Sequence, residues 1–89
     1  MRREPEHFGE EELRLIYVAA RLEEAQAIEG LLQERSVDYL VEADTYTGGV
    51  VFRRERVGAF FYVRAADLER VQAALREGGY RPHRAGSAD

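Results

Sequence analysis

The stretch that decides the fold is Val57-Gly58-Ala59-Phe60-Phe61-Tyr62-Val63. Its β-branched and aromatic residues predict a β-strand. In an antiparallel sheet with one face in water, apolar and polar residues alternate along each strand. Here Phe61 and Val63 alternate with Phe60 and Tyr62, so both faces of the strand are apolar. We therefore expect one face of the sheet to pack on helices and the other face to need a cover of its own.

The segments on either side supply a first strand and two helices. Leu13 to Val18 has the composition of a strand. Over residues 21–35 the apolar residues recur at spacings of three and four, which predicts an amphipathic helix, and residues 65–78 show the same spacing. Each helix thus has one apolar stripe with which to cover a sheet.

Further strands and a hairpin are predicted beyond the first helix. Residues 37–42 have strand composition, and residues 43–49 gather the Asp, Thr and Gly residues of a loop. Residues 50–52 and 57–63 flank the polar quartet Arg53-Arg54-Glu55-Arg56, which favours a hairpin. Residues 80–84 are consistent with a last strand, which Pro82 would restrict to a sheet edge.

This order of elements predicts an α+β fold of the ferredoxin-like, split βαβ type, with two helices on one face of an antiparallel sheet. At 89 residues the chain has the length of one domain, which we assign to residues 13–84. Residues 1–12 hold five glutamates and predict a disordered acidic arm, and residues 85–89 predict a tail.

Composition argues against several classes of function. The chain has no cysteine, and its first residues lack the apolar segment of a signal peptide, so we expect a cytoplasmic protein and not a membrane protein. His7 and His83 have the spacing of neither a metal pair nor a catalytic dyad. We therefore expect no enzyme, no metal and no cofactor. The net charge of -4 disfavours general binding to polyanions.

The two-sided apolar pattern predicts an interaction face. Strict alternation in the first strand turns Ile16 and Val18 toward the helices and Leu13, Leu15 and Tyr17 away from them. The candidate face is therefore Leu15, Tyr17, Phe60 and Tyr62, joined by Leu40 of the second strand with Asp38 and Glu42 at its margins. If the faces are inverted, Val37, Tyr39 and Val41 take the place of Leu40. A bare patch of this size is unusual on a monomer, so we expect a homo-oligomer or a protein partner. The alternative is that the hairpin arm or the N-terminal arm folds back over it.

A second hypothesis is binding of single-stranded RNA. The octapeptide from Arg56 to Val63 resembles the third strand of RNA-recognition motifs, in which aromatic residues stack on bases. Tyr17 and Phe60 would be the stacking residues, with Arg53, Arg54, Arg56 and Arg64 near the phosphates. Gly58 departs from that pattern, since an aromatic residue is expected there.

Residues 13–79 show a closer resemblance to a family. The pattern of Glu24-Ala25, Ile28, Leu31-Leu32 and Val37, followed by a strand leading into Arg64-Ala65-Ala66-Asp67-Leu68-Glu69, is similar to the family of prokaryotic signal transducing proteins, a small domain of unknown function. The resemblance implies a ferredoxin-like fold, compared with that of PII-type regulators, and a regulatory or binding role without catalytic residues. Ser36-Val37 stands where that family commonly has a Gly-Ile turn.

By analogy with the effector loop of PII regulators, the resemblance implies that residues 44–56 form an effector loop with Tyr46 near its tip. The leading expectation is thus a non-enzymatic regulatory or protein-interaction domain. A small-ligand sensor that binds its ligand at a subunit junction is the third hypothesis.

Overall fold

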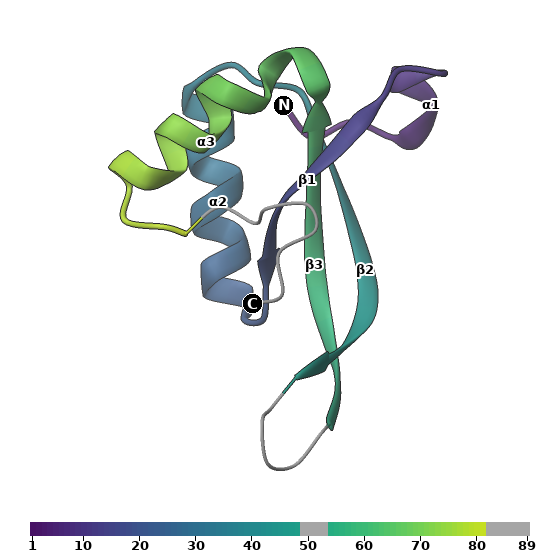
Figure 1. The fold of residues 1–89 in the computed structure, drawn as a ribbon, viewed down its shortest axis with the longest axis vertical. Helices are drawn as coiled ribbons and strands as arrows, with labels where there is room; N and C mark the ends of the chain where they lie inside the picture. Colours follow the sequence, from purple (N-terminus) through teal and green to yellow (C-terminus); the bar gives the residue numbers. More distant parts are fainter. Residues whose placement is uncertain (49–53, 82–89) are drawn as a thin grey trace.

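The computed structural model describes residues 1–48 and 54–81, with only the backbone described at 46–48 and 54–56. Figure 1 shows a sheet with two long helices on one side. The elements in order are α1 (Pro5–Phe8), β1 (Leu13–Ala19), α2 (Leu22–Glu34), β2 (Tyr39–Gly48), β3 (Arg54–Arg64), the 3-10 turn η1 (Ala65–Asp67) and α3 (Leu68–Glu77). The predicted strand at 13–18 and both predicted helices are confirmed.

The described part of the chain forms a mixed α+β structure with a three-stranded antiparallel sheet in the order β1-β3-β2. Strand β3, which contains the deciding stretch, lies in the centre and pairs antiparallel with both neighbours. It follows that β1 and β2 run parallel to each other and are connected through α2.

The core lies between the sheet and the two helices. Phe61 and Val63 of β3 are fully buried against Ile28 and Leu32 of α2 and against Val71 and Leu75 of α3. Burying a side chain of this size stabilises the fold by about 1.5–3 kcal/mol. Both helices therefore pack on the same face of the sheet, as the sequence predicts.

A β-bulge in β1 changes which side chains reach this core. Leu15 pairs with Tyr62, yet the next pair along is Tyr17 with Phe61, so one extra residue, Ile16, is inserted between them. Because a bulge interrupts the alternation of a strand, Ile16 and Tyr17 both pack on the helix side. The prediction that Tyr17 lies on the opposite face is wrong, and Val18, expected on the helix side, pairs with Phe60 on the other face.

Strand β2 is longer than predicted. It continues through residues 43–48, where we expected a loop, and pairs with β3 as far as Gly48 opposite Arg54. Figure 1 shows this hairpin extending well beyond the start of α2. Residues 54–56, predicted to connect the two arms of a hairpin, instead belong to β3 and pair with β2, so that prediction is wrong. The predicted short arm at 50–52, Arg53, and the tail at 85–89 lie outside the described residues. So do positions 82–84 of the predicted last strand, whereas Tyr80 and Arg81 are not in a strand.

The first twelve residues are ordered against the sheet, so the prediction of a disordered arm is wrong. Arg2 pairs in parallel with Tyr39, whose backbone N–H donates to the carbonyl of Met1 (3.0 Å) and whose carbonyl accepts from the N–H of Arg3 (2.8 Å). Phe8, at the end of α1, is only 3% exposed. We call residues 1–12 the strap.

Ser36, directly after α2, adopts a left-handed backbone with φ of 56°. A Cβ atom disfavours this conformation, which glycine adopts freely. We predict that Ser36→Gly raises the free energy of unfolding by about 1 kcal/mol, the part of the left-handed cost that exceeds the extra chain entropy of glycine. Urea unfolding measures it, and Ser36→Ala, which keeps the Cβ, should show no such gain. Equal stabilities of the glycine and alanine variants would contradict this explanation.

Candidate functional site

The register of the sheet gathers apolar side chains on the face opposite α2 and α3. Leu15 pairs with Tyr62 and Val18 pairs with Phe60, and all four are partly exposed. We call these four residues the open face. Three of the four residues predicted for an interaction face lie on it, while Tyr17 does not. Val18 was missed because only the bulge in β1, which strict alternation does not anticipate, turns it outward.

One end of the same face is already covered by the strap. Figure 1 shows α1 on the side of the sheet away from α2 and α3. The guanidinium carbon of Arg64 lies 5.1 Å from the centre of the Phe8 ring, which is cation–π geometry. Leu40, which pairs with Tyr62, is only 6% exposed. The alternative in which the N-terminal segment folds back is therefore realised at this end.

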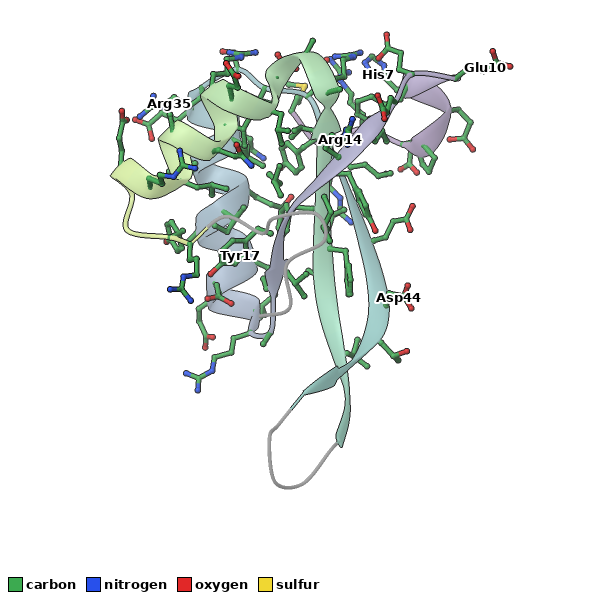
Figure 2. All side chains as sticks on the ribbon, in the orientation of Figure 1. His7, Glu10, Arg14, Tyr17, Arg35 and Asp44 are labelled. Carbon is green, nitrogen blue, oxygen red and sulfur yellow. The ribbon has the colours of Figure 1, made fainter. Side chains whose placement is uncertain are left out.

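Two acidic side chains border the open face along β2. Glu42 pairs with Phe60 and Asp44 pairs with Gly58, and both carboxylates are exposed. In Figure 2 the side chain of Asp44 projects away from the helices. Burial raises the pKa of the Tyr62 hydroxyl, and the charges of Glu42 and Asp44 raise this pKa further. The border of the open face is thus electrostatically negative, which attracts cations and repels phosphates.

An ion cluster centred on Asp38 holds the strap in place. Its carboxylate accepts hydrogen bonds from Arg3 Nε (3.1 Å) and Arg64 Nη1 (3.3 Å), and His7 Nε2 lies 3.3 Å away. Arg64 also donates from Nε to Glu11 of the strap. His7 is labelled at α1 in Figure 2. These contacts connect the strap to the end of β3.

The contacts of Asp38 lower its pKa. Partial burial by itself would raise the pKa of the carboxyl, but the hydrogen bonds from Arg3 and Arg64, the charge of Arg3 and the contact with His7 outweigh it. Together they lower the pKa from 3.8 to about 2. The ionised form of Asp38 is therefore the form that the folded chain stabilises.

Two tyrosines on the helix side serve packing. The buried Tyr39 hydroxyl donates to Glu29 (2.8 Å) and accepts from Gln33 (3.1 Å), while burial and then the interaction with Glu29 raise its pKa to about 12. The Tyr17 hydroxyl donates to Glu24 (2.9 Å), and its ring meets Tyr80 edge to face. Tyr17 therefore lies on the wrong side of the sheet to stack on a base beside Phe60.

Depressions also occur elsewhere on the described surface. One of about 420 Å³ is lined by Met1, Arg3, Gln33, Ser36 and Asp38, and its arginine and aspartate are already paired with each other. Another of about 220 Å³ lies between the start of α2 and the β2–β3 hairpin, next to the exposed Leu22 and Val57. Among the described residues no three His, Cys, Asp or Glu side chains are placed to hold a metal ion.

The residues predicted for a loop and hairpin site are only partly described. Tyr46 lies within β2 and pairs with Arg56, so it is not at the tip of a loop. Arg54 begins β3, and Arg53 falls outside the described residues. The backbone places this end of the hairpin beyond Gly58, away from the strap.

Comparisons of the chain with family models, with curated proteins and with solved structures return no match. The resemblance to the signal transducing family therefore stays a prediction. None of the helices in the part of the chain that the structure describes is long and apolar enough to cross a membrane.

The Asp38 cluster predicts an acid-sensitive attachment of the strap. Because folding lowers the pKa of Asp38 from 3.8 to about 2, its contribution to stability is complete above 3.8 and disappears as the pH falls through about 2. We predict that wild type is more stable than Asp38→Asn at neutral pH and that this difference vanishes near pH 2. Urea unfolding over a pH series measures it, with Glu34→Gln as control for loss of a surface charge. A difference independent of pH would contradict the assignment.

Proposed function

We propose that this chain is a non-enzymatic regulatory domain that binds protein through the open face, and that the protein bound there is a second copy of the chain. The wider arrangement that we propose is ferredoxin-like, since β1 and β2 lie parallel on either side of β3 and are joined by α2. The proposed function is binding at a surface, and it requires no catalytic group.

The observation that carries the proposal is the acidic border formed by Glu42 and Asp44 beside the aromatic residues Phe60 and Tyr62. Glu42 and Asp44 lie next to Phe60 and Tyr62, and their charge affects the hydroxyl of Tyr62. An RNA strand stacked on these rings would bring its phosphates close to two carboxylates, which costs electrostatic free energy. A protein surface with cationic and apolar side chains meets no such penalty.

The same chain has the complementary charges. Three arginines, at positions 53, 54 and 56, occur within four residues at and just before the start of β3. An isologous dimer places the same patch of both copies in contact, so each acidic border can meet the arginine-rich end of the other copy. Charge complementarity within one sequence therefore favours a second copy over an unrelated partner.

The exposure of the open face sets the expected strength of the contact. Its four residues are already partly buried, so association gains only a fraction of the about 1.5–3 kcal/mol that full burial of each side chain would give. Loss of translational and rotational freedom opposes this gain. We therefore propose a weak, reversible dimer, which suits a regulatory domain better than a permanent assembly would.

The first test compares two faces of the molecule. We predict that the chain dimerises in sedimentation equilibrium over a concentration series and that Phe60→Ser weakens the dimer at least about tenfold, because an apolar contact is lost. Leu22→Ser is the matched control, since Leu22 is 72% exposed but lies on α2, on the other side of the sheet. Circular dichroism checks that both variants are folded. Equal weakening by both variants, or by Leu22→Ser alone, would place the contact elsewhere.

A second test distinguishes the dimer from RNA binding, because the two hypotheses predict opposite effects of the same substitutions on affinity. The double variant Glu42→Gln and Asp44→Asn replaces both border carboxylates and so removes negative charge beside Phe60 and Tyr62. We predict that this variant dimerises less tightly, because it loses attraction to the arginines of the other copy. If the face instead binds single-stranded RNA, the same variant would bind a short RNA more tightly in fluorescence anisotropy. A salt-sensitive RNA complex lost in Phe60→Ala and weakened in Arg54→Ala would favour the RNA hypothesis.

A further inference from the structure

The strap divides the sheet surface into a covered end and an open end. Leu40 and Tyr62 are cross-strand neighbours at the end of the sheet where Arg64 lies over Phe8, yet Leu40 is 6% exposed while Tyr62 stays partly exposed on the open face. Phe8 is the buried apolar residue of the strap. The cover therefore adjoins the surface to which we assign binding.

The strap is attached mainly by polar contacts. Arg3, His7 and Glu11 meet Asp38 and Arg64 in ion pairs whose side chains are all at least one quarter exposed. Exposed ion pairs contribute little to stability, because water screens the charges. Further polar contacts include backbone hydrogen bonds to Tyr39, a hydrogen bond from the Met1 amino group to the Val37 carbonyl, an ion pair between Arg2 and Glu29 of α2 (3.9 Å), and a bond from the Ala65 N–H to the carbonyl of Glu12 (3.1 Å).

Phe8 adds one buried apolar side chain to these polar contacts. The large buried side chains of the core are fixed by α2, α3 and the sheet together, whereas Phe8 comes from a helix of four residues with no core of its own. Segments with few apolar contacts open at lower free energy than the global unfolding of a domain. Release of the strap can therefore occur while the core stays folded.

We propose that the strap is autoinhibitory. Phe8 must leave its buried position before the second copy can contact the sheet from the open face as far as Leu40. This inference rests on the proposed dimer. If only the released fraction of molecules is competent, the apparent dissociation constant is raised by the reciprocal of that fraction for each copy. The strap then sets the concentration at which the chain dimerises.

The experiment removes the Phe8 side chain in the full chain. We expect Phe8→Ser to dimerise at least about tenfold more tightly than wild type in sedimentation equilibrium, because both copies then start with the strap released. Glu10→Gln, an exposed strap residue, is the matched control and should leave the dimer unchanged. Asp38→Asn loosens the ion cluster without removing an apolar group and should shift dimerisation in the same direction. The double variant Phe8→Ser with Phe60→Ser should lose the gain.

Hydrogen exchange supplies a readout that does not depend on dimerisation. The Tyr39 N–H donates to the carbonyl of Met1, so its protection reports whether the strap is in place. We expect faster exchange at Tyr39 in Phe8→Ser at concentrations where the chain is monomeric, with unchanged protection in α2. A wild-type dimer that depends on Phe60 but is not strengthened by Phe8→Ser overturns the cover and leaves the proposed function intact. Absence of a dimer in wild type and Phe8→Ser alike overturns both.

Discussion

Burial of Phe61 is the constraint on which the structure depends. The residue lies in the central strand, is fully buried, and has Tyr17 and Val41 as its neighbours on the two flanking strands. Because side chains alternate along a strand, fixing Phe61 and Val63 against the helices turns Phe60 and Tyr62 to the other side. The apolar character of the open face is thus a direct result of how the core is made, and the strap is the cover that the chain itself provides for part of it.

The extent to which the sequence predicts this structure depends on whether the signal is local. Both long helices and the central strand follow from spacing and composition, which are local properties. The position of Tyr17 does not, because it depends on the bulge at Ile16, a feature of the register between β1 and β3. The extension of β2 past Glu42 was missed because Asp44 and the following threonines have loop composition, while pairing with β3 keeps them extended.

The strap shows how a composition rule fails. Five glutamates among twelve residues favour a solvated segment, and one phenylalanine gives little hydrophobic signal against them. What orders the segment is a set of partners distant in sequence, namely Asp38, Tyr39 and Arg64. The acidic border of the open face is only partly predictable from the sequence. Glu42 is expected at the margin of the outer sheet face, whereas Asp44 has loop composition, and the register with Gly58 brings it onto the same face.

The pairing of Arg2 with Tyr39 also has a consequence for biosynthesis. Residues 1–12 leave the ribosome before the strands that receive them, and their partners Arg64 and Ala65 are synthesised after all the others. The β2–β3 hairpin is local and needs no earlier segment to form, whereas closing the strap joins residues more than fifty positions apart. The strap is synthesised before its partners but is expected to dock after the strands have paired, so a nascent chain exposes the whole outer surface of its sheet before it covers any of it.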